Sequence, residues 1–195
     1  MNVKIPRKQL ILEALASELE SSPGARITIA VLARSVGITE AALYRHFASK
    51  AQMFDALIGF AEETVFSRIN QILDEEKDTA VRCAQIVYLM LGFAERNPGI
   101  ARVLLGDALV GEDDRLHLRT ERFFARLETQ FKQIMRESRM RDDVAASLAI
   151  EDSAQIVLAF IEGRMHRFVR SQFKKRPLDR WEQQWSVVAS SVFSS

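Results

Sequence analysis

Three adjacent side chains that could carry out chemistry, Tyr44, Arg45 and His46, lie within the stretch ITEAALYRHFASK, residues 38–50. A histidine beside a tyrosine and an arginine offers the groups that general acid–base catalysis uses. The same groups also suit contacts with nucleic-acid phosphates and base edges when they lie on an exposed helix. No residue close in the sequence is placed to orient His46, so the surrounding elements must decide between the two chemistries.

Those elements have the proportions of a helix-turn-helix. The sequence predicts one helix that starts after the N-cap residue Thr28 and stops at Gly37, where a positive φ is allowed. A second helix is predicted to start after Thr39 and to end near Phe47. The small Ala33 lies where the helices should meet, above apolar residues spaced to form a small core, Leu32, Val36, Ile38, Leu43 and Phe47. The alternative is a helical corner whose polar face is only solvated.

With its apolar side inward, the second helix would present small residues at its start, which allow close approach to base edges. Arg45 could donate to guanine or phosphate, and Lys50 with the free amides of the next helix could form a second phosphate site. Residues 1–50 carry seven basic and four acidic side chains, and this local excess favours DNA over a solvated corner. The predicted DNA-binding residues are Arg7, Lys8, Thr28, Thr39, Glu40, Ala41, Ala42, Tyr44, Arg45, His46 and Lys50.

The stretch ITIAVLARSVGITEAALYRHFASKAQMFDAL resembles the DNA-binding segment of TetR-family regulators. One departure is Ala41, at a position where many members have glycine. Further segments, RINQILDEEKDTA, LLGFAERNPGIARVL and RFVRSQFKKRP, resemble the nucleoid occlusion branch of that family across nearly the full length. That resemblance implies a homodimer on palindromic double-stranded DNA, with the number of dimers per site left open. It also implies contact with the division protein FtsZ, whose assembly is blocked over unsegregated DNA.

A possible partner site follows the predicted DNA-binding helices. Phe60 and Arg68 are eight residues apart, about 12 Å along one helix face. An aromatic anchor followed by an arginine suits an apolar peptide that carries acidic groups. The alternative is that Phe60 is ordinary core and Arg68 is a solvated charge. The resemblance implies FtsZ-binding residues at Phe60, Arg68, Leu89, Gly92, Arg96 and Asn97.

The C-terminal third carries two apolar stripes at helical spacing, which are typical of a four-helix interface between two subunits. One stripe contains Trp181, Trp185, Val188 and Val192, and the other contains Ile156, Phe160, Gly163 and Arg167. These eight residues are the predicted dimer interface. The alternative is that the stripes pack only within one subunit. A dimer would also supply two reading helices about 34 Å apart, the spacing of successive major grooves.

Helical periodicity throughout, with prolines only at its breaks, predicts an all-α fold of about nine helices. Beyond the helix-turn-helix, helices are expected at about 7–21, 50–73, 79–96, 100–109, 113–139, 146–174 and 178–193. Residues 1–50 should form the DNA-binding domain, and residues 51–195 a helical dimerisation and partner-binding domain. A capping box of Ser49 and Gln52 should start the helix that follows residue 50.

The remaining signals indicate a soluble, cytoplasmic protein, and the resemblance implies that it is associated with the nucleoid. Cys83 is the single cysteine, and no signal peptide or membrane span is expected. We expect no enzymatic activity, cofactor or metal, because no convergent set of polar groups contains a general base. A conventional TetR-type repressor controlled by a small effector remains the alternative. This alternative is less favoured, because bulky residues could fill the cavity that an effector needs. They are Phe123, Phe124, Leu127, Phe131 and Ile134.

Overall fold

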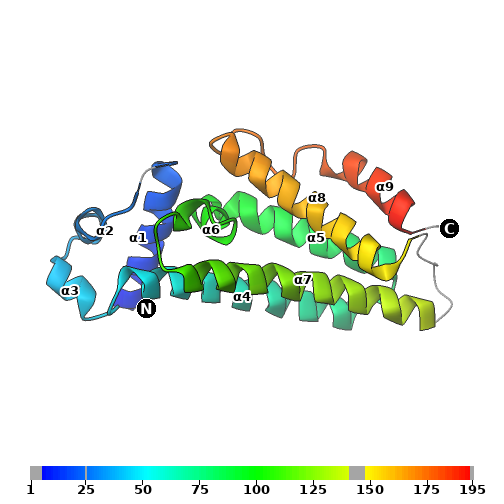
Figure 1. Cartoon of the computed structure of the whole chain (residues 1–195), viewed down its shortest axis with the longest axis horizontal. Coiled ribbons are helices and arrows are strands. Elements are labelled where there is room, and N and C mark those ends of the chain that lie inside the picture. Colours follow the sequence, from blue (N-terminus) through cyan, green and yellow to red (C-terminus); the bar gives the residue numbers. More distant parts are fainter. Residues whose placement is uncertain (1–5, 25, 141–147, 194–195) are drawn as a thin grey trace, which may run out of the picture. The chain divides into compact units, whose positions relative to one another are not determined.

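The computed structural model describes residues 6–24, 26–140 and 148–193, with residues 138–140 described only as part of a helix (Figure 1). Its regular elements are helical, which confirms the predicted all-α fold. They are α1 (Arg7–Ser21), α2 (Ile29–Val36), α3 (Glu40–Tyr44), α4 (Lys50–Glu75), α5 (Thr79–Arg96), α6 (Pro98–Leu104), the 3-10 turn η1 (Asp107–Leu109), α7 (Asp114–Met140), α8 (Ile150–Arg170) and α9 (Trp181–Val192). No helix in the described ranges is long and apolar enough to cross a membrane.

The chain divides into two compact units, and neither is continuous in sequence. The N-terminal unit contains residues 1–61 and 97–120, and the C-terminal unit contains residues 62–96 and 121–195. Helices α4 and α7 therefore each contribute residues to both units. The predicted boundary at residue 50 separates a DNA-binding domain from a partner-binding domain. The two units are defined by packing alone, so this boundary stays a prediction.

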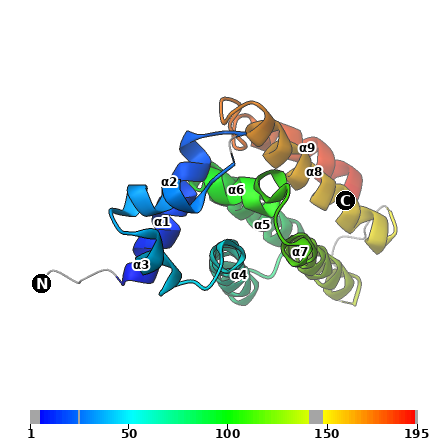
Figure 2. The same ribbon diagram turned by 60° about the vertical axis from the view of Figure 1, so that its left-hand side comes forward.

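In the N-terminal unit, α1 packs against both α2 and α6 (Figure 2). Its buried residues Ile11, Leu15 and Leu19 recur at four-residue spacing and form the inner face. Helix α6 begins at Pro98 and approaches α1 so closely that a Cβ on Gly99 would lie 2.2 Å from the Ala16 carbonyl oxygen. Segment 97–120, far away in sequence, is thus part of the support for the predicted DNA-binding helices.

A buried arginine caps the C-terminal end of α1. Arg102 is only 2% exposed, and its Nη1 donates to the carbonyl oxygens of Leu19 at 2.7 Å and Ser22 at 3.2 Å. Its Nε lies 2.5 Å from a carboxylate oxygen of Asp107. The last carbonyls of a helix have no partner within it, so a buried cation there satisfies them and compensates its own charge through Asp107.

The C-terminal unit is built on α5, which packs against α8, and on α8, which packs against α9. The part of α7 in this unit turns its bulky side chains inward, as predicted. Phe66 and Phe123 stack edge to face with ring centroids 5.3 Å apart, and Phe123 does the same with Phe124 at 5.3 Å. The buried residues of this face are Phe123, Phe124, Leu127, Phe131 and Ile134.

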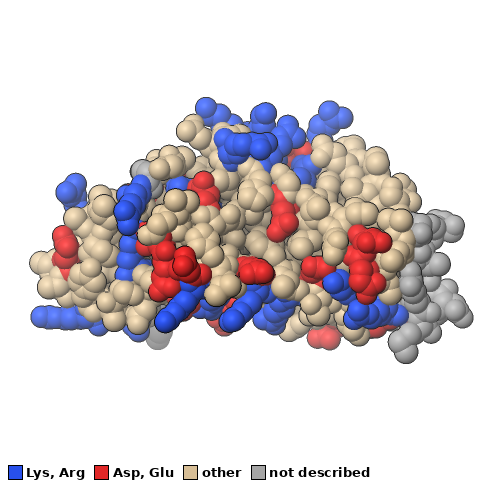
Figure 3. Space-filling model, in the orientation of Figure 1, with Lys and Arg blue, Asp and Glu red and all other residues tan. Residues whose placement is uncertain are grey.

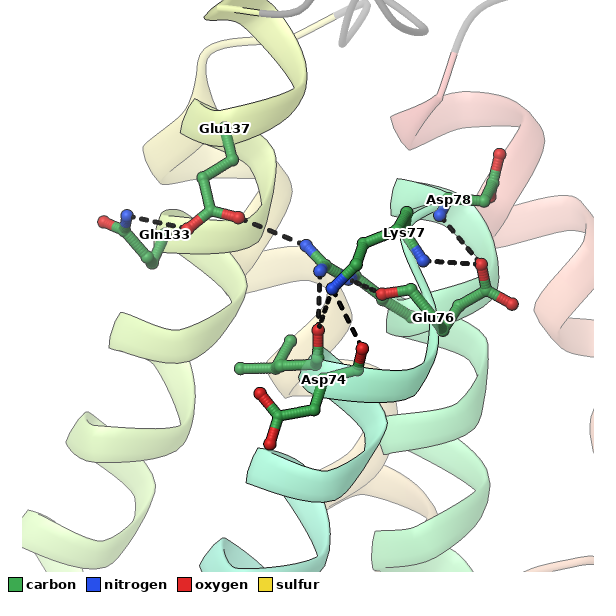
Figure 4. A network of polar contacts seen from close by, with 8 residues as sticks. Asp74, Glu76, Lys77, Asp78, Gln133 and Glu137 are labelled. Carbon is green, nitrogen blue, oxygen red and sulfur yellow. Dashed lines mark hydrogen bonds and ion pairs between the residues drawn. The ribbon is translucent and has the colours of Figure 1, made fainter.

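A network of polar contacts, shown in Figure 4, fixes the turn between α4 and α5. Arg82 donates to the carbonyl oxygens of Leu73 at 2.8 Å and Glu76 at 2.6 Å, and pairs with Glu137 of α7 at 3.1 Å. The Glu76 carboxylate in turn accepts the backbone N–H groups of Asp78 and Lys77, which lower the pKa of that side chain. These contacts hold the turn between the two helices rigid.

The observed helix ends differ from the predicted ones at several places. Helix α9 begins at Trp181 rather than at 178, directly after Arg180 with φ 54°. Helix α3 ends at Tyr44 rather than near Phe47, because the His46 N–H turns back to the Leu43 carbonyl in a tighter turn. The helix expected at 100–109 is split into α6 and η1 at Gly106, whose φ is 77°. Helix α8 ends at Arg170 rather than at 174, because φ turns positive at residue 172. It begins at Ile150, and positions 146 and 147 of its expected start lie outside the described residues.

Candidate functional site

Each helix of the predicted helix-turn-helix is capped as the sequence indicates. The Thr28 hydroxyl accepts the N–H of Val31 at 3.3 Å, and the Thr39 hydroxyl accepts the N–H of Ala42 at 3.1 Å. Gly37 has φ 71°, and the N–H of Ile38 reaches back to the Ala33 carbonyl at 3.0 Å. This is the Schellman pattern of helix termination, in which a left-handed residue reverses the chain. The turn therefore orients α3 through backbone hydrogen bonds as well as through packing.

The core beneath α2 and α3 contains most of the predicted residues. Leu32, Ala33, Leu43 and Phe47 are buried, whereas Val36 and Ile38 are half-buried. A hydrogen bond from the Ser35 hydroxyl to Glu18 ties α2 to α1. Because the apolar side of α3 is committed to this core, its other side is left to solvent.

The predicted contact residues of α3 lie on that free side. Those at its start and end are exposed, namely Thr39, Glu40, Ala41, Tyr44 and Arg45. Tyr44 is 47% exposed, a high exposure for an aromatic side chain that has no polar or aromatic partner among the described residues. Ala42 and His46 are half-buried. The face thus offers small residues at the helix start and hydrogen-bonding groups at its end, the pattern expected of a base-reading helix.

Arg7 and Lys8, two of the predicted DNA-binding residues, lie in the first turn of α1 and are exposed. The Lys8 ammonium lies 5.7 Å from the ring centroid of Phe47, which places Lys8 beside the residues that follow α3. Arg7, Lys8 and α3 therefore belong to one positively charged part of the N-terminal unit. Whether each residue touches DNA remains a prediction.

Lys50 has a more constrained setting than the sequence indicated. Its ammonium lies 2.5 Å from a carboxylate oxygen of Glu112, and both side chains are mostly buried. The same ammonium lies 5.4 Å from the ring centroid of Phe54. A phosphate contact by Lys50 must therefore compete with Glu112. Neighbouring amides are also used, since Gln52 accepts the Ala48 N–H at 2.9 Å and its own N–H donates to Ser49 at 3.2 Å.

The arrangement favours binding over acid–base chemistry. In the described part of the chain no side chain or carbonyl hydrogen-bonds to the His46 imidazole, whereas activated bases are commonly oriented by such a partner. The described residues also contain no cluster of three His, Cys, Asp or Glu side chains that could hold a metal ion.

A second candidate site is a groove of about 530 Å3 in the C-terminal unit, between α4, α5 and the start of α9. Three of the predicted partner-binding residues, Arg68, Leu89 and Arg96, line this groove together. The Arg96 guanidinium covers Gly92, where a Cβ would lie 3.2 Å from Nη1. The small residue therefore lets the arginine lie flat against α5.

Three predicted partner-binding residues are not among those that line the groove: Phe60, Asn97 and Gly92, which is buried in α5 beneath Arg96. Phe60, which is 48% exposed, and the half-buried Asn97 both belong to the N-terminal unit. The exposure of Phe60 is consistent with a contact residue and does not fit the alternative that it is ordinary core. The roles of all three residues remain predictions.

The groove also contains residues that the sequence reasoning missed. Tyr88 is 49% exposed and its ring lies 5.5 Å from that of Trp181, so two aromatic side chains form one wall. A usable signal was present, because Val81, Gln85 and Tyr88 follow one another on one face of α5. The other unpredicted lining residues are Ile72, Glu75 and Ala84.

The predicted dimer stripes are only partly available to a second subunit. Trp185 and Val192 are buried within this chain, and the Trp185 ring lies 6.0 Å from that of Phe160. Trp181 contributes to the groove, and Val188 is half-buried. On α8, Ile156, Gly163 and Arg167 are exposed and Phe160 is half-buried. The exposed stripe of α8 thus remains the better candidate interface, together with Val187, which is 67% exposed and was not predicted.

Comparison with known proteins gives consistent matches over both units. A model described as bacterial regulatory proteins of the tetR family matches residues 11–57. An SlmA-like model described as a tetracyclin repressor-like C-terminal domain matches residues 77–192. The chain is 51% identical to the nucleoid occlusion factor SlmA of Shewanella frigidimarina and 53% identical to that of Shewanella halifaxensis, each alignment covering 98% of both proteins.

Solved structures with the same fold are much more distant in sequence. The MbdR regulator from Azoarcus sp. CIB matches with a TM-score of 0.81 at 15% identity, covering 96% of this chain and 100% of that one. FadR from Bacillus subtilis, solved in complex with stearoyl-CoA, matches with a TM-score of 0.73 at 13% identity, covering 94% and 98%. At these identities the likeness concerns the fold alone.

Proposed function

This chain belongs to the SlmA nucleoid occlusion factors of the TetR family, and on that premise we propose how its two candidate sites work together. The N-terminal unit binds palindromic DNA on the chromosome as part of a homodimer. The groove of the C-terminal unit binds FtsZ and so blocks division-ring assembly over the nucleoid. The protein is accordingly nucleoid-associated and acts by binding rather than by catalysis.

The DNA-binding part rests on the exposed edge of α3. Phosphate contacts from Arg7, Lys8 and Tyr44 would set the register of the protein on the duplex, while Arg45 and the start of α3 read the bases. Because the phosphate contacts release counterions, affinity should fall steeply with salt. A single unit reads only a half-site, and a dimer reads both halves of a palindrome.

The observation that carries the FtsZ part is the groove that Arg68, Leu89 and Arg96 line together. Tyr88 and Trp181 give it an aromatic wall, and the two arginines lie among the lining residues as cationic anchors. An extended or helical peptide with apolar side chains and a few carboxylates is complementary to such a surface. We therefore assign the groove to a short acidic segment of FtsZ.

The bulky side chains of α7 fill the interior of the C-terminal unit, and this argues against a conventional effector-controlled repressor. A small effector needs a cavity among the C-terminal helices, and such pockets commonly have several hundred cubic ångströms. Phe123, Leu127 and Phe131 are at most 1% exposed and occupy that position. The 530 Å3 groove opens between α4, α5 and α9 instead, where a peptide can enter from the side.

Co-sedimentation with FtsZ polymers tests this proposal. The protein should reduce the amount of polymer pelleted, and a specific palindromic DNA should strengthen the effect. A scrambled DNA of the same length is the matched control and should not strengthen it. Unchanged FtsZ polymer with either DNA would contradict the FtsZ assignment, whereas equal affinity for the palindromic and the scrambled DNA would contradict sequence-specific binding.

A further inference from the structure

A pocket lined almost entirely by cations lies at the connection between α8 and α9. Its volume is about 230 Å3, and Figure 3 shows the blue side chains gathered over this connection. The lining residues are Arg164, Arg167, Lys174, Lys175, Arg176, Asp179, Arg180 and Gln184. We call this the α8–α9 basic pocket. Six of its eight residues are positively charged and one is negative, so its net charge is strongly positive.

Few carboxylates among the described residues compensate this charge. Arg176 lies 3.7 Å from a carboxylate oxygen of Glu95. Across residues 6–24, 26–140 and 148–193, no ion pair joins an acidic side chain to Arg167, Lys174 or Lys175. Burial, and secondarily the positive charge of Arg167, hold the pKa of the Arg164 guanidinium below its ordinary value. Like charges that converge with few acidic partners create a positive potential that attracts an anion from outside the chain.

The backbone that carries these cations is held in an unusual conformation. Gln172, Phe173 and Arg180 have φ values of 51°, 64° and 54°, and they are the non-glycine residues with positive φ in the described part of the chain. Such residues persist only where surrounding contacts fix them, and they cluster at ligand sites. Two of them precede Lys174, Lys175 and Arg176 directly, and the third lines the pocket.

Buried contacts hold this connection in place. Arg164 donates to the carbonyl oxygens of Pro177 and Asp179, each at 2.6 Å, and also bonds to the Gln184 side chain. The Phe173 ring packs 5.1 Å from that of Phe168, and the Lys175 N–H donates to the Ser171 hydroxyl at 2.9 Å. Arg164 is therefore a positioning residue that shapes the pocket before any ligand arrives, which lowers the entropic cost of binding.

The size and chemistry of the pocket restrict its ligand. Its 230 Å3 is below the usual range for drug-sized ligands, and its lining includes no aromatic side chain on which a base could stack. Guanidinium groups match phosphate oxygens through paired hydrogen bonds. Duplex DNA spreads its charge along an extended backbone, which needs an extended face rather than a compact pocket. We propose that the α8–α9 basic pocket binds a small anion with two or more linked phosphoryl groups.

Isothermal titration of the full-length protein with inorganic tripolyphosphate tests this proposal, with ATP as a second ligand. The variant K174Q/K175Q removes two pocket charges outside the predicted dimer stripes. The variant R122Q/R136Q removes two exposed charges on α7 and is the matched control. Tripolyphosphate should bind the wild type and the control equally, and K174Q/K175Q roughly tenfold or more weakly. Similar affinities for ATP and tripolyphosphate would identify the free phosphate chain as sufficient, whereas much tighter ATP binding would identify a nucleotide.

Three results would overturn the proposal. One is the absence of tripolyphosphate binding at about 0.1 M salt, where weak surface contacts are screened. Another is equal binding by K174Q/K175Q and the control. The third is loss of tripolyphosphate binding in R45A with K174Q/K175Q unaffected, because the anion would then occupy the DNA-binding unit. FtsZ sedimentation on the same preparations keeps this test separate from the proposed function.

Discussion

The Lys50 ammonium lies 2.5 Å from the Glu112 carboxylate, so a side chain predicted to bind DNA phosphate is held by the loop that precedes α7. Both residues belong to the N-terminal unit. A phosphate contact by Lys50 would therefore compete with this ion pair for one cation, and the loop around Glu112 would then tune DNA affinity without touching DNA.

Glu112→Gln should strengthen binding to the palindromic DNA by about fivefold, because the released ammonium can neutralise a phosphate. Lys50→Gln should weaken binding and lower the slope of log affinity against log salt by about one. Fluorescence anisotropy over a salt series measures both quantities. Asp55→Asn, which removes a carboxylate paired with Arg119 in the same unit, is the control and should change neither. Unaltered affinity in Glu112→Gln would show that Lys50 does not contact phosphate.

Arg45→Ala should lower affinity for the palindrome by about 1–3 kcal/mol while affecting a scrambled DNA much less. The reason is that Arg45 lies exposed at the end of α3, where a bidentate contact to a base edge is possible. Competition binding with both DNAs measures the specificity ratio. Arg34→Ala removes an exposed charge from α2 and should weaken both DNAs similarly or not at all. An unchanged specificity ratio in Arg45→Ala would remove Arg45 from base reading.

The support of the DNA-binding helices can be tested at Gly99. Gly99→Ala places a Cβ 2.2 Å from the Ala16 carbonyl oxygen, and backbone on both sides must shift. We expect a loss of about 2 kcal/mol in the free energy of unfolding, measured by urea denaturation. Gly59→Ala is the control, because its Cβ would meet only the end of the Arg119 side chain at 3.3 Å. Equal stability of the two variants would contradict the close contact of α1 and α6.

Gly163→Ala tests the predicted dimer surface on α8. A Cβ at this position meets nothing within 4 Å in the single chain, so helix propensity alone would stabilise the variant by about 1 kcal/mol. If a second subunit packs closely against Gly163, the dimer dissociation constant should instead rise, by about tenfold. Analytical ultracentrifugation measures it. A dimer as tight as the wild type, with a higher melting temperature, would remove Gly163 from the interface.

The helix-turn-helix was predictable because its signals are local. Caps at Thr28 and Thr39, a left-handed Gly37 and four-residue apolar spacing each act within one or two turns, and the structure reproduces them. The end of α3 was placed about three residues too late because the tight turn at His46 depends on packing rather than on a helix breaker. Local chemistry therefore places the capped starts of α2 and α3 better than the end of α3.

Relationships over long sequence distances were not predictable. Nothing near Lys50 in the sequence indicates Glu112, sixty-two residues later, and nothing near Leu19 indicates Arg102. Trp181 and Trp185 look equivalent on one stripe, but one lines the groove and the other is buried in its own subunit. Periodicity shows that a face is apolar, and only the packed chain shows what covers it.

The most direct test of the central claim is FtsZ binding by Arg68→Glu, measured with DNA affinity on the same preparation. Arg68 lines the groove with Leu89 and Arg96 and lies outside the DNA-binding helices. We predict loss of FtsZ binding with unchanged affinity for the palindrome, and no effect on either in the control Arg122→Glu. FtsZ binding by Arg68→Glu at the wild-type level would contradict the assignment of this groove.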